Sequence, residues 1–330
     1  DCMPHYYRIT NGHGQGAERI MNAEAEFLQG RFVDAQICLE NTYVHIAENG
    51  QENMVLCCDF LALRLALCTE LSLSYTIAER RKELLRRHNI TWVTLFDSVC
   101  AYYYALSGQI TQIPVLFREH QLSTVNFLAP GKPMMELIEN QVYLAQQEYA
   151  KVIGRSEGLL AVCEAMHYAL VALHVQIQTA AAYECLGKRT EARNCLKRAL
   201  QIALPDQFYL PFVENYEYLE ELLQREIQTA DAAEHVFLTK VTELGKNCQK
   251  RYGALRKTHM FPKIAAELTE QEQRIIELLA ERLSNREIAE KLFLSEGTIK
   301  QYINRIYAKL QISGDVRTKR RQLIELLTAE

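Results

Sequence analysis

The sequence is poor in the residues that mark turns. It has 14 glycines and 7 prolines in 330 residues, and a single tryptophan. So few turn signals predict long helices joined by short connections rather than a sheet with many tight turns. The fractions of hydrophobic (48%) and charged (24%) residues are typical of a folded protein. A chain of this length can form two domains with their own cores.

The sequence also lacks the patterns of secreted and membrane proteins. Its ten cysteines include no CxxC pair, so we expect reduced thiols in a cytoplasmic protein. No apolar run follows a basic start, and the most apolar stretch, residues 159–183, contains Glu164, His167 and His174. We therefore expect neither a signal peptide nor a membrane span. The net charge of −4 excludes a protein coated with basic side chains, so any nucleic-acid site must be local.

Catalytic patterns are absent too. There is no nucleophile–base pairing and no GxxxxGK[ST] phosphate loop, because the glycine cluster at Gly12, Gly14 and Gly16 lacks the lysine. We expect no enzyme activity and no cofactor.

Two clusters have alternative interpretations. Cys163, His167 and His174 could share a helix face as soft-metal ligands, although a packed helix is the favoured interpretation. Trp92 and the run Tyr102–Tyr104 could line an effector groove or simply belong to the core.

Two segments share a spacing that is typical of helical hairpins. In each, a glycine is followed at offsets 5, 9 and 12 by small or apolar residues. The segments are FLQGRFVDAQICLENT, with Gly30, Ala35, Leu39 and Thr42, and YECLGKRTEARNCLKRAL, with Gly187, Ala192, Leu196 and Ala199. The glycine would end one helix, and the small residues would let the next pack closely against it.

Two further copies are degenerate. YLAQQEYAKVIG keeps Ala150 but has Ala145 in place of the glycine, and ALSGQITQIPVLF keeps Gly108 and Phe117 but has isoleucine in place of the alanine. The pattern resembles the tetratricopeptide repeat, whose helix pairs stack into a solenoid. We expect such a solenoid over residues 1–226 and a helical linker over residues 227–262.

From residue 263 onward the sequence predicts a small helical domain that ends at residue 330. Thr269 with Glu272, and Ser284 with Glu287, form two capping boxes, and Ser295 is the expected N-cap of a third helix. Short capped helices this close together predict a compact three-helix unit.

The third helix, residues 296–310, predicts a recognition surface. At 100° per residue Ile299, Ile303, Ile306 and Leu310 form one stripe, which we expect to be buried. The opposite face offers amides and cations, as the major groove of DNA requires. We expect four residues to read base edges: Lys300, Gln301, Asn304 and Ala308. We expect five to contact phosphates: Ser295, Thr298, Arg305, Lys309 and Arg317.

The charge distribution favours the same surface. Residues 291–321 carry eight basic and two acidic side chains, whereas residues 264–290 carry three basic and seven acidic ones. A structural three-helix bundle with a solvated charged face is the alternative.

The residues of this domain resemble the LuxR-type helix-turn-helix. The motifs are Leu268-Thr269-x-x-Glu272, Asn285-x-Glu287-Ile288-Ala289, Leu294-Ser295, Thr298-Ile299-Lys300 and Lys309-Leu310. Tyr302 departs from the histidine that is common in that family. Sigma-factor region 4 is a competing module, but a fourth amphipathic helix with Leu323, Ile324, Leu326 and Leu327 favours the LuxR type, which pairs through that helix.

The order of repeats and DNA-binding domain is similar to the C-terminal part of the large, ATP-binding LuxR-type regulators of the maltose-activator group. The resemblance implies an all-α transcription activator that binds double-stranded DNA as a homodimer, contacts RNA polymerase and senses an unidentified small molecule or protein. Because the chain starts with Asp1, we expect that an upstream ATPase domain has been removed, rather than that the protein is a shorter relative of that group. The alternative function is a protein-binding scaffold whose terminal domain serves assembly.

Overall fold

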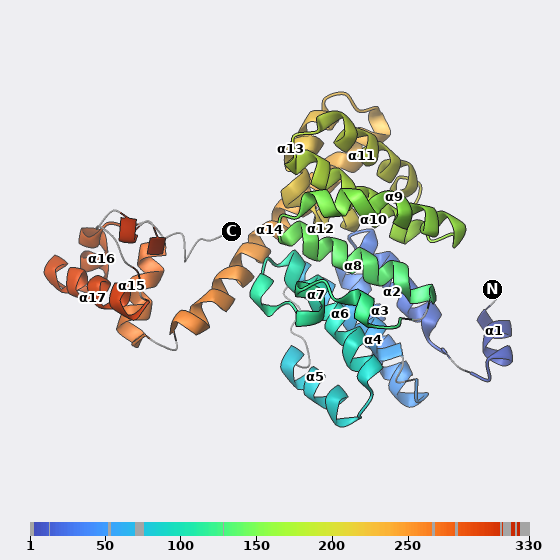
Figure 1. The fold of residues 1–330 in the computed structure, drawn as a ribbon, viewed down its shortest axis with the longest axis horizontal. Helices are drawn as coiled ribbons and strands as arrows, with labels where there is room; N and C mark the ends of the chain where they lie inside the picture. Colours follow the sequence, from blue (N-terminus) through green and yellow to red (C-terminus); the bar gives the residue numbers. More distant parts are fainter. Residues whose placement is uncertain are drawn as a thin grey trace. The chain divides into compact units, whose positions relative to one another are not determined.

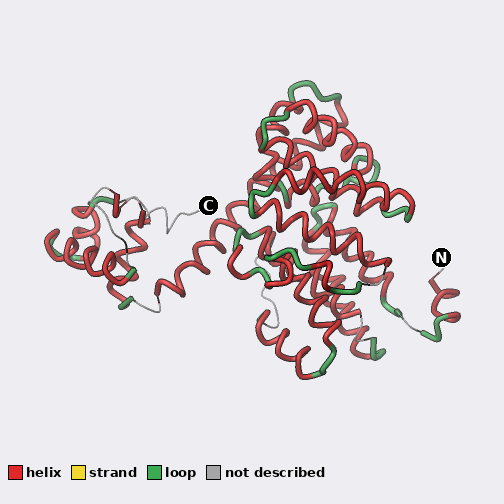
Figure 2. The backbone as a smooth tube through the Cα atoms, in the orientation of Figure 1, coloured by secondary structure: helices red, strands yellow, loops and turns green. Residues whose placement is uncertain are grey.

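The computed structural model describes residues 3–12, 14–51, 54–69, 76–127, 129–265, 268–280, 283–310, 312, 318–320 and 322–323. All regular secondary structure in these residues is helical (Figures 1 and 2). The predicted all-α fold is confirmed. The chain divides into two compact units, Asp1–Tyr252 and Gly253–Glu330, and this division falls inside the segment 227–262 that the sequence predicts as a linker.

Most of the helices belong to the first unit. In chain order they are α1 (Met3–Ile9), α2 (Ala17–Leu28), α3 (Phe32–Glu48), α4 (Val55–Cys68), α5 (Ile77–Arg86), α6 (Ile90–Leu106), α7 (Val115–Arg118), α8 (Lys132–Ala145), α9 (Tyr149–Ala165), α10 (Ala169–Cys185), α11 (Arg189–Ala203), α12 (Leu210–Glu214) and α13 (Tyr216–Ile227). Three 3-10 turns, Ile110–Gln112, Leu122–Thr124 and Ala129–Gly131, lie between α6 and α8. Helix α14 (Ala232–Ala265) begins in this unit.

Helices that are consecutive in the chain pack side by side. The pairs α2/α3, α8/α9 and α10/α11 are such neighbours (Figure 1). Helices two places apart also touch: α2 contacts α4, α4 contacts α6, α6 contacts α8, and α8 contacts α10. The first unit is therefore a stack of helical hairpins, and their tetratricopeptide type stays a prediction.

The hairpin turns share one backbone conformation. A residue with positive φ lies two positions before the next helix starts: Gly30 (74°), Gln147 (62°), His167 (56°) and Gly187 (71°). Glycine adopts this left-handed conformation without steric cost, whereas the other residues do not. The prediction that a glycine forms the turn is thus correct for the turns before α3 and α11.

The turn before α9 corrects the predicted repeat register. Gln147, not Ala145, occupies the place of Gly30. Counted from Gln147, the offsets 5 and 9 fall on Val152 and Ser156, and both are buried. Ala150, which the sequence comparison aligned with the buried alanines, is exposed. The predicted register is wrong by two residues because a glutamine, rather than a glycine, adopts the left-handed conformation.

The turn at His167 corrects a second expectation. Residues 159–183 are not one core helix, because α9 ends at Ala165 and α10 begins at Ala169. Cys163 lies on α9, His167 in the turn and His174 on α10. The three therefore do not share a helix face. No group of three His, Cys, Asp or Glu residues that could hold a metal ion occurs among the described residues.

A buried cluster of charges joins five helices of the first unit. The guanidinium of Arg64 on α4 donates from Nη1 to Glu24 Oε1 on α2 (2.6 Å) and from Nε to Glu214 Oε1 on α12 (2.6 Å). The hydroxyl of Tyr102 on α6 donates to the other oxygen of Glu214 (2.9 Å). The opposite charges and hydrogen bonds offset the cost of burying these groups.

His174 on α10 completes this cluster without adding a charge. Its Nδ1 lies 4.0 Å from Glu214 Oε2. Burial, and then the positive charge of Arg64, lower the pKa of His174 to about 3. The imidazole is therefore neutral at neutral pH, and its contact with Glu214 is not an ion pair.

The aromatic residues that the sequence singled out mostly belong to the core. Tyr102 and Tyr103 are buried, and Tyr104 packs against a buried cluster that includes Phe96. Trp92 is half-buried and lines a pocket of about 290 Å³ in the first unit.

No helix among the described residues is both long and apolar enough to cross a membrane.

Candidate nucleic-acid interface

The second unit contains three short helices that begin at side-chain caps. They are α15 (Glu270–Ala280), α16 (Asn285–Leu292) and α17 (Glu296–Lys309). The backbone N–H of Thr269 donates to Glu272 Oε2 (2.8 Å), and the backbone N–H of Glu272 donates to Thr269 Oγ1 (3.4 Å). Ser284 and Glu287 form the same reciprocal box before α16. Both predicted capping boxes are confirmed, and they fix where these helices start.

Ser295 caps the third helix. Its Oγ accepts a hydrogen bond from the backbone N–H of Thr298 (3.0 Å) and lies 2.7 Å from Thr298 Oγ1. Both hydroxyls, predicted as phosphate contacts, thus sit at the start of α17. Anions are favoured at this end of a helix because free N–H groups and the helix dipole point there.

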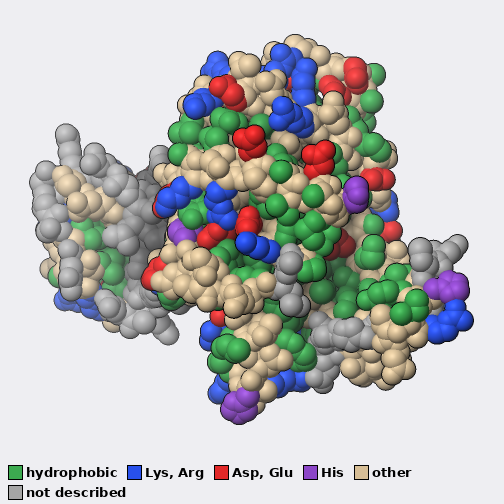
Figure 3. All heavy atoms as spheres, turned by 45° about the vertical axis from the view of Figure 1, so that its right-hand side comes forward, with side chains coloured by type: hydrophobic (Ala, Val, Ile, Leu, Met, Phe, Trp, Pro, Cys, Tyr) green, Lys and Arg blue, Asp and Glu red, His purple; other side chains and the backbone are tan. Residues whose placement is uncertain are grey.

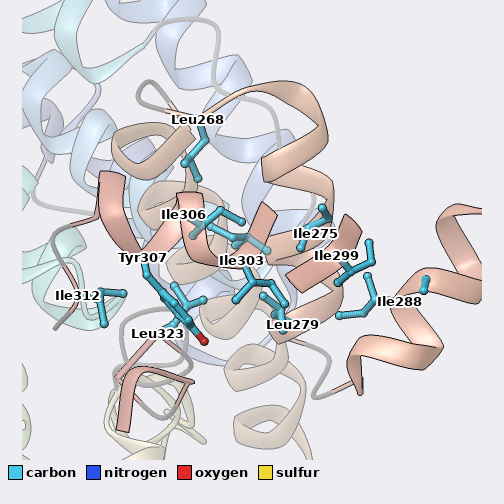
Figure 4. Packing of buried hydrophobic residues seen from close by; sticks show 12 residues of the cluster. Leu268, Ile275, Leu279, Ile288, Ile299, Ile303, Ile306, Tyr307, Ile312 and Leu323 are labelled. Carbon is cyan, nitrogen blue, oxygen red and sulfur yellow. The ribbon is translucent and has the colours of Figure 1, made fainter. Parts of the chain in front are cut away.

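The predicted apolar stripe of α17 is buried. Ile299, Ile303 and Ile306 point into a cluster with residues of α15 and α16 (Figure 4). Leu310 packs partly against the same cluster. Tyr307 is also buried, 5% exposed, which the stripe did not predict. The core thereby fixes which face of α17 is turned outward.

The outward face carries the predicted reading residues. Lys300, Gln301, Asn304 and Ala308 are all exposed. Lys300 Nζ lies 3.0 Å from Glu296 Oε1 one turn earlier. Such an exposed pair contributes little to stability, so the ammonium can exchange this carboxylate for another acceptor.

Arg305 lies on the same surface. Its side chain is exposed, and the guanidinium carbon is 5.7 Å from the centre of the Tyr302 ring. This cation–π contact would hold the guanidinium at one edge of the exposed face. Tyr302, the departure from the family pattern, therefore has a local contact.

Lys309 has a different environment from the other predicted phosphate contacts. Its Nζ donates to Glu272 Oε2 (2.7 Å), and the Glu272 side chain is only 3% exposed. Burial alone would raise the pKa of Glu272, but hydrogen bonds from Lys309 and Thr269 outweigh it and hold this pKa below its ordinary value. The ammonium is thus engaged inside the unit and ties the end of α17 to the start of α15. The phosphate contact of Lys309 stays a prediction, and its ammonium already has this partner within the unit.

A second cation that sequence reasoning did not assign has a similar role. The guanidinium of Arg320 donates from Nη1 to Asn285 Oδ1 (2.7 Å) and from Nη2 to the carbonyl of Leu283 (2.6 Å). It ties residues after α17 to the start of α16. The basic run around Arg320 pointed to phosphate binding, and no signal in the sequence indicated this contact.

Several predicted residues lie outside the part of the chain that the structure describes. Arg317 is one of them, and so are Ile324, Leu326 and Leu327 of the expected fourth helix. Leu323 is described and is buried in the core cluster of the second unit.

The turn between α16 and α17 has an unusual residue. Phe293 adopts φ +56° and its side chain is 94% exposed. The backbone N–H of Leu294 donates to the carbonyl of Ala289 (3.0 Å) and closes the turn. A short helix, a closed turn and a second helix with an exposed polar face define a helix-turn-helix.

Comparison with known proteins agrees with this geometry. Residues 266–320 match the family described as bacterial regulatory proteins, luxR family. Over 43 residues the chain is 49% identical to the DNA-binding transcriptional activator DevR/DosR of Mycobacterium tuberculosis (strain ATCC 25618 / H37Rv). This match covers 13% of the chain and 20% of that relative's length. No solved structure matches the chain. The second unit thus contains a luxR-family DNA-binding domain.

Proposed function

We propose that the protein is a transcription regulator that binds double-stranded DNA through α17. The observation that carries this proposal is the division of that helix into two faces. Ile299, Ile303 and Ile306 are buried, while the amides and cations between them are exposed. An α-helix with such a face fits the width of the major groove.

Each exposed residue has a proposed task. The amides of Gln301 and Asn304 pair with adenine edges, Lys300 donates to guanine, and Ala308 contacts a thymine methyl. Ser295, Thr298, Arg305 and Arg317 bind phosphates on either side of the groove. Lys309 is the weakest of the proposed phosphate contacts because its ammonium already pairs with Glu272.

The other proposed properties concern the whole protein. It activates transcription, contacts RNA polymerase, acts in the cytoplasm and binds a repeated operator as a homodimer. The similarity to an activator supports the direction of control. The first unit, as a tetratricopeptide-like sensor, binds an effector or partner. The chain itself has no enzyme activity.

The test is DNA binding by the full chain. DNA fragments selected from a random pool are measured by fluorescence anisotropy over a range of salt concentrations. We expect Asn304→Ala and Gln301→Ala each to lower discrimination between selected and random DNA by about 1–3 kcal/mol. Arg305→Ala should weaken binding to both DNAs alike and make the salt dependence less steep.

Matched controls lie on α11 of the first unit. Gln201 and Lys197 are exposed there, and Gln201→Ala and Lys197→Ala should leave binding unchanged. If Asn304→Ala and Gln301→Ala discriminate as well as these controls, α17 does not read the bases.

A protein-binding scaffold is the second candidate function. Three exposed apolar residues on α3 favour it, because Val33, Ile37 and Val44 lie on one helix face, interrupted by the exposed Glu40, and are 71%, 52% and 57% exposed. Exposed apolar residues that line up in this way are typical of interaction surfaces. Absence of salt-dependent DNA binding would favour this function over the regulator.

A further inference from the structure

The first unit contains a polar cavity that the proposed DNA-binding function does not use. Its volume is about 530 Å³, which is in the range of small-molecule sites. Residues 120–127 form one wall, and helices α8 and α9 form the other. Glu136, Glu139 and Tyr143 line it from α8, and Arg155 lines it from α9.

The ring of Tyr143 in this cavity already has two neighbours. The imidazole of His120 stacks on Tyr143 with ring centres 3.8 Å apart and planes 9° from parallel. The guanidinium carbon of Arg155 lies 5.3 Å from the centre of the same ring. His120 and Arg155 thus occupy the surroundings of this ring, and charge, hydrogen bonds and the apolar side chains of the lining are what the cavity offers a ligand.

The position of His120 is fixed by its neighbours. Gln146 Nε2 donates to the carbonyl of Arg118 (3.0 Å), which turns Gln146 Oε1 toward His120 Nε2 at 2.7 Å. His120 therefore donates from Nε2. Its buried Nδ1 has no hydrogen-bond partner and lies 3.6 Å from Glu139 Oε1. His120 is thus held by Gln146 on one side and faces Glu139 on the other.

Both signs of charge line the cavity in equal number. Glu139, whose side chain is 7% exposed, pairs with Arg155. At the more exposed end of the cavity, Lys132 Nζ lies 3.9 Å from Glu136 Oε1. Two carboxylates and two cations favour a ligand with no net charge that carries both signs itself. Basic and acidic side chains are also interspersed on the face of this unit that Figure 3 shows.

We propose that this cavity binds a small zwitterion, namely a free α-amino acid with an apolar side chain. Its ammonium group would be accepted by Glu136 and Glu139, and its carboxylate by Arg155 and Lys132. Val125 and Met135, which line the same cavity, would contact the apolar side chain. This inference rests on the sensing role proposed for the first unit and specifies the class of effector.

The test measures binding to the full chain by calorimetry. L-Leucine and L-methionine are the probes, and N-acetyl-L-leucine and L-leucinamide are the matched probes, because each lacks one of the two charges. We expect the free amino acids to bind and each blocked derivative to bind at least about tenfold more weakly, since it cannot form one of the two sets of charge-assisted hydrogen bonds. Glu136→Gln should weaken leucine binding by about fivefold to tenfold.

Glu164→Gln is the control variant, because Glu164 is exposed on α9 and does not line the cavity. The proposal is overturned if neither amino acid binds at concentrations up to about 10 mM. It is also overturned if a blocked derivative binds as well as leucine, or if Glu136→Gln and Glu164→Gln bind leucine equally.

DNA binding is measured in parallel without amino acid. If DNA binding is present and leucine binding absent, only the effector class is wrong. If leucine binds and DNA does not, the regulator function fails while the site stands.

Discussion

The neutral, buried His174 makes the stability of the first unit depend on pH. In the folded state its pKa is about 3, and its ordinary value is 6.5. As the pH falls, the unfolded chain therefore takes up a proton before the folded chain does. The contribution of His174 to the free energy of unfolding is fully present above pH 6.5 and is lost as the pH falls from 6.5 toward 3.

The size of the effect follows from proton linkage. One proton changes the free energy of unfolding by about 1.4 kcal/mol per pH unit, so lowering the pH from 8 to 5 should remove about 2 kcal/mol. The range above pH 5 is chosen because ordinary carboxyl groups titrate below it. His174→Phe keeps a ring of similar size without a proton site, and it should resist this loss.

Urea unfolding followed by tryptophan fluorescence is the assay. Trp92 is the only tryptophan of the chain and lies on α6, so its fluorescence reports on the first unit. At pH 8 we expect His174→Phe to unfold within about 1 kcal/mol of the wild type, because the buried Nδ1 that it removes has no partner. At pH 5 the variant should be the more stable by about 2 kcal/mol.

The control is His235→Gln, because His235 is exposed on α14, and it should keep the wild-type pH dependence. His174→Gln serves as a second variant if the ring of phenylalanine packs poorly. If both His174 variants lose as much stability between pH 8 and pH 5 as the wild type, the proton is taken up elsewhere and the reasoning about the buried cluster is refuted.

Three further substitutions test local packing and capping. Gly245→Ala would place Cβ 2.4 Å from the buried ring of Tyr216. The overpacking destabilises by about 3 kcal/mol, and the higher helix propensity of alanine stabilises by about 1 kcal/mol. In the same fluorescence assay we therefore expect the free energy of unfolding to fall by about 2 kcal/mol. Ser295→Ala should cost about 1 kcal/mol and speed hydrogen exchange in the first turn of α17, whereas unchanged exchange would contradict the cap. Lys309→Met should destabilise the second unit by about 1–2 kcal/mol, seen by circular dichroism without a change in tryptophan fluorescence. The double variant with Glu272→Gln should recover most of that loss, and no recovery would mean that the pair is not coupled.

Local patterns in the sequence were sufficient to predict the helix starts of the second unit. A capping box needs only four residues, so Thr269 with Glu272 and Ser284 with Glu287 could be found directly. The buried stripe of α17 also follows from helix geometry, which fixes Ile299, Ile303 and Ile306 on one side. These features depend on neighbours in the chain, and all of them agree with the structure.

Contacts between distant residues could not be predicted in this way. Lys309 projects to the outer part of the helix, but its partner Glu272 lies 37 residues earlier. Arg64 and Glu214 are 150 residues apart, and neither belongs to a motif. A charged side chain can be assigned to solvent, to a ligand or to an internal partner only when the fold brings those candidates together.

The glutamine in the turn before α9 has an evolutionary consequence. In the left-handed region Gln147 costs about 1 kcal/mol in the folded chain. Glycine would avoid that cost, but its greater freedom in the unfolded chain offsets part of the advantage. The net cost of losing the glycine is then small beside the stability of a whole domain, so mutation can erase it while the hairpin is kept. Relatives of this unit could therefore diverge until glycine-based searches miss them, and the spacing of buried residues would be the more durable signature.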